Sequence, residues 1–269
     1  MDAGQIDREV LLLDMGGTFM FGCDRFSSPH QLASTYLELG GGRLSERDVA
    51  GAISQVIARM EPLYASEAHY ESFPSVRDVL PECHVETPLD PEDVDILTEV
   101  FARHEVGTIP DSHRAILKEL AGSYRLGVVS NVWGSSSVFR AAFDAAGVSD
   151  LFEVTVFSSD YGCIKPSPRI FRRALAAMNV DPLQAAFVGD DLRCDISGAK
   201  RAGMAAVWIS PGDVPATAHP APDLVIRDLG NGELGIDQRK VGGSAPGPTS
   251  QSGRLDVEQR HGRRRGICA

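Results

Sequence analysis

The sequence predicts an α/β fold in which helices cover both faces of a parallel β-sheet. From about residue 111 onward, short apolar runs alternate with segments of helical period, which is typical of strands joined by crossover helices. Residues 26–108 follow a different pattern, because helical periods succeed one another there without an intervening strand. We therefore expect a small helical domain inserted after the first strand of an α/β core.

The elements of the core follow from these runs. The expected strands are Val10–Leu13, Leu126–Val129, Val154–Phe157, Ala186–Val188 and Ala206–Ile209. The expected helices are Ser112–Ala121, Ser136–Ala146, Pro168–Met178 and Cys194–Ala202. Gly147 and Gly203 stand where two of these helices end, and glycine adopts the left-handed conformation of a helix C-cap without steric cost.

Three helices are expected in the insertion, at Gln31–Leu39, Glu46–Met60 and Glu92–Glu105. The triple glycine at 40–42 is interpreted as a loop, because it neither follows a strand nor opens a GK[ST] turn. From about residue 230 the chain is rich in glycine, serine and arginine, so a disordered tail is expected. The predicted domains are thus a core of residues 1–25 and 109–229, an insertion of residues 26–108, and a tail of residues 230–269.

Composition narrows the possible partners. The chain has 269 residues and a formal net charge of -11, and residues 1–230 show no clustered basic face for a nucleic-acid backbone. No apolar run is long enough to span a bilayer, and the first residues lack the pattern of a secretion signal, so we expect a cytoplasmic protein without a membrane partner. The five cysteines are odd in number and scattered, which predicts neither a disulfide framework nor a zinc site.

Polar clusters stand at the ends of the predicted strands or shortly after them. They are Asp14-Met15-Gly16-Gly17-Thr18, Ser130-Asn131, Lys165-Pro166, and Gly189-Asp190-Asp191 followed by Asp195. In an open parallel sheet, ligands bind beyond the carboxyl ends of the strands. We therefore expect these clusters, although distant in sequence, to meet in one site.

Together the four clusters resemble the motifs of the haloacid dehalogenase (HAD) superfamily, and residues 187–204 match its fourth motif almost throughout. The resemblance implies a Rossmann-like core with a type-1 helical cap. It also implies that Asp14 attacks phosphorus and forms an aspartyl phosphate. Mg²⁺ would be held by Asp14, the backbone carbonyl of Gly16, and Asp190.

The remaining polar residues have expected roles as well. Ser130, Asn131 and Thr18 would bind the phosphoryl oxygens, which gain charge in the transition state. Lys165 would neutralise both the nucleophile and the phosphate. Asp191 and Asp195 would support this arrangement from behind, by holding metal-bound waters or the lysine.

Gly16 departs from the family pattern, in which phosphatases carry at this position an aspartate that handles the proton of the leaving group. Positioned proton transfer typically contributes 10²- to 10⁴-fold to a rate, so the loss matters most for poor leaving groups. A phosphonatase is disfavoured because the insertion contains no lysine, and a 2-haloacid dehalogenase because Asp190 and Asp191 are retained. The candidate replacements for the missing acid are Asp24, His30, His69, His84 and His104.

Two functions stay open at this point. The first is a Mg²⁺-dependent phosphatase of a small phosphorylated metabolite; the second is a catalytically impaired module that binds phosphate or a phosphorylated ligand. The sequence names neither the substrate nor the oligomeric state. A second anionic group on a substrate could be recognised by arginines in or beside the insertion, namely Arg25, Arg43, Arg47, Arg59 and Arg77.

Overall fold

A computed structural model describes residues 8–210, 212 and 220–230 of the chain. Its centre is a six-stranded sheet in the order β3-β2-β1-β4-β5-β6, in which every pair of neighbours is parallel. The strands are β1 (Val10–Leu13), β2 (Arg125–Ser130), β3 (Phe152–Phe157), β4 (Ala185–Gly189), β5 (Ala205–Ile209) and β6 (Leu224–Ile226). The predicted α/β fold is confirmed, whereas the predicted disorder of the tail concerns residues 231–269, which lie outside the described residues.

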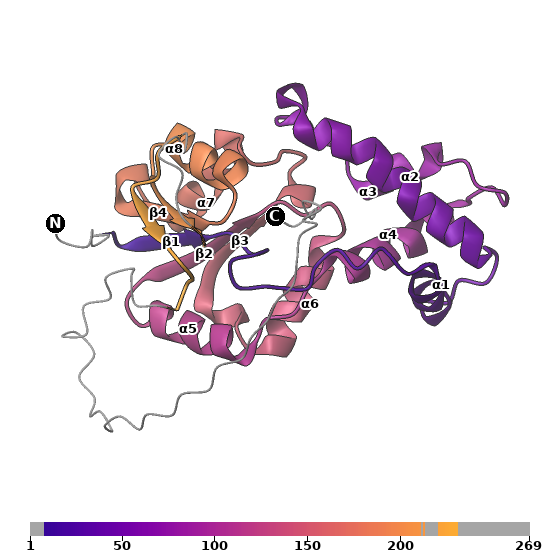
Figure 1. Cartoon of the computed structure of the whole chain (residues 1–269), viewed down its shortest axis with the longest axis horizontal. Helices are drawn as coiled ribbons and strands as arrows, with labels where there is room; N and C mark the ends of the chain where they lie inside the picture. Colours follow the sequence, from indigo (N-terminus) through magenta and orange to yellow (C-terminus); the bar gives the residue numbers. More distant parts are fainter. Residues whose placement is uncertain (1–7, 211, 213–219, 231–269) are drawn as a thin grey trace.

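Helices cover both faces of this sheet (Figure 1). Helices α5 (Asp111–Ala121) and α6 (Ser136–Ala146) pack on one face, and α7 (Pro168–Met178) and α8 (Ser197–Ala202) pack on the other. Successive side chains of a strand point to opposite faces, and β1 shows the result. Its residues Leu11 and Leu13 join the core on the α5/α6 face, while Val10 and Leu12 join the core on the α7/α8 face.

The five expected strands are present, with ends that differ by at most two residues, and β6 is an additional strand. Gly147 and Gly203 end α6 and α8 with φ angles of 66° and 88°, which confirms the predicted left-handed caps. The helix expected over residues 194–202 differs, because a π-helical turn (Leu192–Ile196) precedes α8. Short 3-10 turns occur at Ser149–Leu151, Ser158–Asp160 and Pro182–Gln184.

The helical insertion contains α1 (Pro29–Glu38), α2 (Glu46–Ala65), α3 (Val76–Val79) and α4 (Pro91–Glu105), with 3-10 turns at Glu67–His69 and Leu80–Glu82. It has a hydrophobic core of its own, and two residues of the α/β domain, Trp133 after β2 and Ile164 before α7, also belong to this core. Within the described part of the chain, no helix combines the length and the apolar character needed to cross a membrane. Helix α2 runs through Pro62 to Ala65, five residues beyond the expected end at Met60.

Backbone hydrogen bonds at two places join the segments that enter and leave the insertion. Phe21 and Thr108 exchange backbone hydrogen bonds of 2.9 and 2.8 Å, and the amide of Arg25 donates to the His104 carbonyl at 2.8 Å. The Arg25 guanidinium donates to the carbonyl oxygens of Arg103 and Val106. The two ends of the insertion therefore lie side by side.

Candidate active site

The turn after β1 brings Asp14 to the carboxyl edge of the sheet. The amides of Thr18, Phe19 and Met20 all donate to the Met15 carbonyl, so the chain reverses direction directly behind Asp14. Gly17 has a φ of +70°, and a Cβ at this residue would lie 2.4 Å from Asp190 Oδ2. Only glycine satisfies both the backbone angle and the close approach. The turn therefore places the ends of β1 and β4 against each other.

Lys165 lies between two carboxylates in the interior. Its Nζ donates to Asp14 Oδ1 at 2.5 Å and to Asp195 Oδ1 at 2.7 Å, and all three side chains are at most 2% exposed. Burial alone would lower the pKa of the lysine, but the charges of Asp14 and Asp195 outweigh burial and raise that pKa above its ordinary value. Lys165 is therefore a permanent cation beside Asp14.

Asp14, Asp190 and Asp195 form an acidic cluster whose nearest oxygens lie within 4.8 Å of one another. Burial, followed by the charge of Asp14, raises the pKa of Asp190 to about 7. Asp14 Oδ2 and Asp190 Oδ1 are buried and have no hydrogen-bond partner among the described residues. Buried carboxylate oxygens left in this way fit a bound divalent cation, because a hard cation such as Mg²⁺ takes oxygen ligands and offsets the excess negative charge.

Ser130 and Asn131 extend the site from the end of β2. Ser130 Oγ donates to Asp14 Oδ1 at 2.9 Å, so one oxygen of Asp14 is held by both Ser130 and Lys165. Asn131 Oδ1 accepts from the Lys165 amide at 2.8 Å. Asn131 Nδ2 donates to the Lys165 carbonyl at 3.3 Å and to the hydroxyl of Tyr64 at 3.0 Å. The Asn131 side chain thus ties the β2 loop to the lysine loop and to α2.

The acidic residues after β4 are arranged by the π-helical turn. Asp191 Oδ1 accepts from the amides of Arg193 and Cys194, both at 2.7 Å, and so caps this turn. Asp195 Oδ2 accepts from the Asp191 amide at 3.0 Å, while its other oxygen holds Lys165. A Cβ at Gly189 would lie 2.3 Å from Asp195 Oδ2, so the glycine gives the carboxylate its room.

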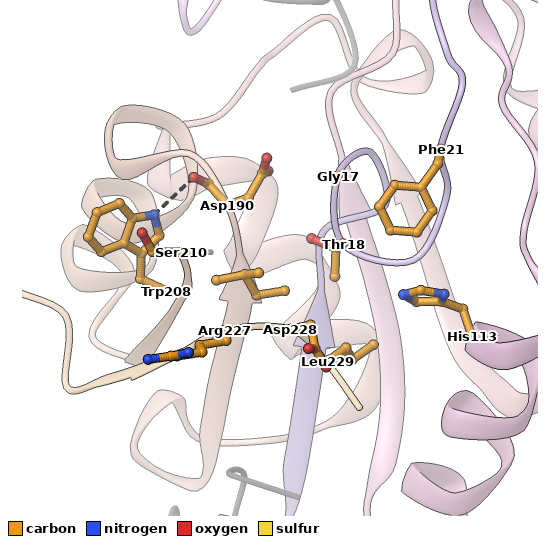
Figure 2. Close-up of a pocket in the computed structure, with 11 residues that line it drawn as sticks. Gly17, Thr18, Phe21, His113, Asp190, Trp208, Ser210, Arg227, Asp228 and Leu229 are labelled. Carbon is orange, nitrogen blue, oxygen red and sulfur yellow. Dashed lines mark hydrogen bonds between the residues drawn. The ribbon is translucent and has the colours of Figure 1, made fainter. Parts of the chain in front are cut away.

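A pocket of about 520 Å³ opens beside these residues. Figure 2 shows Asp190 and Trp208 on one side of it, Phe21 and His113 on the other, and Thr18 between them. Of the predicted site residues, Thr18 and Asp190 line the pocket. The Thr18 hydroxyl is buried and has no hydrogen-bond partner in the described part of the chain, as expected of a group that binds a ligand.

Several candidates from the sequence have other contacts. His104 is bound to Thr35 Oγ1 and to the Arg25 carbonyl, both at 2.9 Å, and the His30 side chain is 84% exposed beside Glu46. His84 is exposed, and His69 is half-buried in a 3-10 turn. Of the arginines, Arg43, Arg59 and Arg77 pair with carboxylates, Arg25 is bound to backbone carbonyls, and Arg47 is exposed.

The structure adds residues that sequence reasoning missed. Tyr64 and Tyr70 from the helical insertion meet Arg193, and Tyr64 reaches Asn131. Glu105, at the end of α4, is fully buried and accepts from the amides of Trp133 and Gly134, both at 2.7 Å. The hydrogen-bond partners of Tyr64, Tyr70 and Glu105 lie far away in the sequence, so no local sequence pattern could have revealed these contacts.

Curated relatives match part of the chain. A phosphoserine phosphatase of Thermus thermophilus is 33% identical over 52% of this chain and 56% of its own length. A glyceraldehyde 3-phosphate phosphatase of Pyrococcus abyssi is 36% identical over 39% of this chain and 43% of its own length. The chain therefore spans about half the length of these relatives.

Solved structures share the fold over a larger part of the chain. A HAD phosphatase from Thermococcus onnurineus has a TM-score of 0.52 and 24% identity over 82% of this chain and 94% of its own. The L-2-haloacid dehalogenase from Xanthobacter autotrophicus has a TM-score of 0.54 and 19% identity over 84% of this chain and 97% of its own. The family model of haloacid dehalogenase-like hydrolases matches residues 9–203. The chain belongs to the haloacid dehalogenase-like hydrolases.

Proposed function

We propose that the protein is a Mg²⁺-dependent phosphatase that hydrolyses a small phosphorylated metabolite through an aspartyl phosphate at Asp14. The observation that carries this proposal is that the two oxygens of the Asp14 carboxylate have different surroundings. Its Oδ1 is held by Ser130 and Lys165, and its Oδ2 has no partner among the described residues. Oδ1 is fixed, desolvated and next to a lysine, which suits nucleophilic attack on a phosphoryl group, and Oδ2 is left for the metal.

The proposed metal ligands are Asp14, the backbone carbonyl of Gly16, and Asp190. The unpartnered oxygens of Asp14 and Asp190, within one acidic cluster, support this assignment. Bound Mg²⁺ would supply positive charge to the phosphoryl oxygens. Asp195 and Asp191 would keep Lys165 and the turn after β4 in position, since Asp195 holds the ammonium and Asp191 caps the turn.

Ser130 and Asn131 are proposed to contact the phosphoryl group from the β2 side, with Thr18 on the side of the pocket. Lys165 would neutralise charge on the phosphoryl oxygens as the phosphorus–oxygen bond breaks, which is the main contribution that a protein makes to phosphoryl transfer. The names of the two relatives, which are phosphatases of phosphoserine and of glyceraldehyde 3-phosphate, support a small phosphorylated substrate.

A second function is favoured by one observation, namely that Gly16 has no side chain to protonate a leaving group. In this alternative the same site binds phosphate or a phosphorylated ligand without turnover. The two functions make different predictions for a purified protein, because only the first releases inorganic phosphate.

The deciding experiment is a phosphate-release assay with a panel of phosphorylated metabolites, with Mg²⁺ and again with EDTA. We expect release of phosphate from at least one compound, loss of that release with EDTA, and no turnover by Asp14→Asn. Asp111→Asn, which changes an exposed carboxylate at the start of α5, is the matched control. No release from any compound, together with Mg²⁺-dependent phosphate binding measured by calorimetry, would favour the binding module.

A further inference from the structure

One cap tyrosine reaches the proposed phosphate site. Tyr64, near the end of α2, has its hydroxyl 3.0 Å from Asn131 Nδ2 and 3.4 Å from Cys194 Sγ. Asn131 follows Ser130, and its side-chain amide is hydrogen-bonded to both the backbone N–H and the backbone carbonyl of Lys165. The Tyr64 phenol therefore lies at the junction of three loops that carry the proposed site residues.

Two neighbours of this phenol favour negative charge on its oxygen. Asn131 Nδ2 donates a hydrogen bond to that oxygen, and the Arg193 guanidinium carbon lies 5.1 Å from the centroid of the Tyr64 ring. Arg193 also donates to the Tyr64 carbonyl at 3.2 Å, which holds the cation beside the ring. Burial and the neighbouring Cys194 thiol raise the pKa of the phenol well above its ordinary value, and Asn131 and Arg193 offset only part of this rise. The resting phenol keeps its proton, and a transient phenolate would have two stabilising partners.

The site needs such a proton donor. Gly16 has no side chain, His104 is tied to Thr35 and the Arg25 carbonyl, and His30 is exposed beside Glu46. An alkoxide leaving group is more basic than an ordinary phenolate, so proton transfer from a tyrosine to an alkoxide is favourable, and the raised pKa of Tyr64 makes this driving force smaller. The hydroxyl of Tyr64 is therefore suited to protonating the leaving group, for which Gly16 offers no side chain.

We propose that Tyr64 is the general acid of this phosphatase and substitutes for the carboxyl group absent at Gly16. The proposal rests on the proposed function. As an Asp14 oxygen bonds to phosphorus, the bond from phosphorus to the leaving oxygen breaks, and that oxygen takes both the electron pair and the phenol proton. Water then attacks the aspartyl phosphate, its proton goes to the phenolate, and the bond from phosphorus to Asp14 breaks. Alcohol and phosphate are released, and both side chains return to their starting states.

The test compares leaving groups in Tyr64→Phe. This variant keeps the ring, which packs against Phe73 and Trp133, and removes only the hydroxyl. Tyr70→Phe is the matched control, because the Tyr70 hydroxyl also accepts from Arg193, at 2.8 Å, whereas the hydrogen bond from Asn131 Nδ2 goes to Tyr64. The substrates are an alkyl phosphate from the active panel and p-nitrophenyl phosphate, whose weakly basic leaving group needs little protonation.

We expect Tyr64→Phe to lower kcat/KM for the alkyl phosphate by about 10²-fold or more, and for p-nitrophenyl phosphate by less than about 5-fold. Tyr70→Phe should change both values by the same factor. Equal losses on both substrates in Tyr64→Phe would overturn the acid role and leave the phosphatase proposal intact. Failure of the unsubstituted protein to cleave either substrate would instead overturn the phosphatase proposal, and the acid role with it.

A second measurement covers the case in which Tyr64→Phe does not fold. Tyr64→difluorotyrosine retains the hydroxyl and lowers its pKa. A general acid works only while it is protonated, so the loss of alkyl phosphate turnover at high pH should shift to lower pH in this variant. The profile for p-nitrophenyl phosphate should not move, and identical profiles for both substrates would contradict the proposal.

Discussion

Gly17 and Asp190 approach each other so closely that a Cβ on Gly17 would lie 2.4 Å from Asp190 Oδ2. The contact joins the turn after β1 to the end of β4, and Asp190 is one of the proposed Mg²⁺ ligands. Space at residue 17 therefore controls the position of a carboxylate that we propose to bind the metal.

Gly17→Ala should displace Asp190 and weaken Mg²⁺ binding by about 10- to 100-fold, as loss of a ligand's support typically does. Gly22→Ala is a matched control, because Gly22 has a similar φ of +71° but nothing within 4 Å of an added Cβ. Both variants should lose about 1–2 kcal/mol of unfolding free energy from backbone strain alone. Titration calorimetry with Mg²⁺ separates the two effects, and equal Mg²⁺ affinity in both variants would refute the steric explanation.

Replacement of Lys165 should be costly because the side chain neutralises two buried carboxylates. Lys165→Met should lower the unfolding free energy by about 3–5 kcal/mol, the usual cost of leaving a buried ion pair broken. It should also abolish measurable turnover. Lys200→Met removes a partly exposed lysine paired with Asp223 and should cost at most about 1 kcal/mol. Urea unfolding measures both values, and similar losses in the two variants would contradict the central position of Lys165.

Glu105 makes stability depend on pH. Burial, opposed by the Trp133 and Gly134 amides, raises the pKa of this carboxyl from its ordinary value to about 8. A raised folded-state pKa gives stability that is fully present below the unfolded-state pKa near 4.5 and is lost as pH rises through about 8. The unfolding free energy should therefore fall between pH 5 and 8, by up to about 1.4 kcal/mol per pH unit from this group.

Glu105→Gln should flatten that slope, since an amide does not titrate. Glu99→Gln, which changes an outer carboxylate of the same helix paired with Arg103, should leave the slope in place. Chemical unfolding at several pH values gives the comparison. A slope that persists in Glu105→Gln would assign the pH dependence to other groups.

The acid role of Tyr64 also predicts a rescue. In the Tyr64→Phe background, Gly16→Asp restores a carboxyl group at the position where family phosphatases have one. Turnover of alkyl phosphates should then rise by about 10-fold or more. Gly16→Asn has the same size without an acidic proton and should not rescue. Equal turnover in the Asp and Asn variants would show that the gain comes from packing rather than proton transfer.

The sequence was sufficient to predict the parts of the fold that depend on local pattern. Buried strands such as β1 appear as continuous apolar runs, and glycines mark the ends of α6 and α8. Strand β6 was missed because its three residues make too short a run. The helix predicted to end at Met60 continues through Pro62, which the structure accommodates in the last turn of α2, although proline usually disrupts a helix.

Local sequence pattern predicts only part of the site as well. Its core residues could be named because they follow strands in the order of a known family. The Tyr64 contact could not be predicted, because Tyr64 lies beyond the expected end of its helix and 67 residues before Asn131. Likewise, nothing in the local sequence distinguishes Glu105 from the exposed acidic residues of α4; burial against the Trp133 and Gly134 amides does so.

The central claim is that Asp14 becomes phosphorylated during turnover. The most direct measurement mixes the protein and Mg²⁺ with ³²P-labelled acetyl phosphate, quenches the reaction in acid within milliseconds, and maps the labelled peptide. We predict an acid-stable, hydroxylamine-sensitive label on the peptide that contains Asp14, and no label in Asp14→Asn. Release of phosphate under single-turnover conditions without a label on that peptide, or a label that persists in Asp14→Asn, would contradict the account.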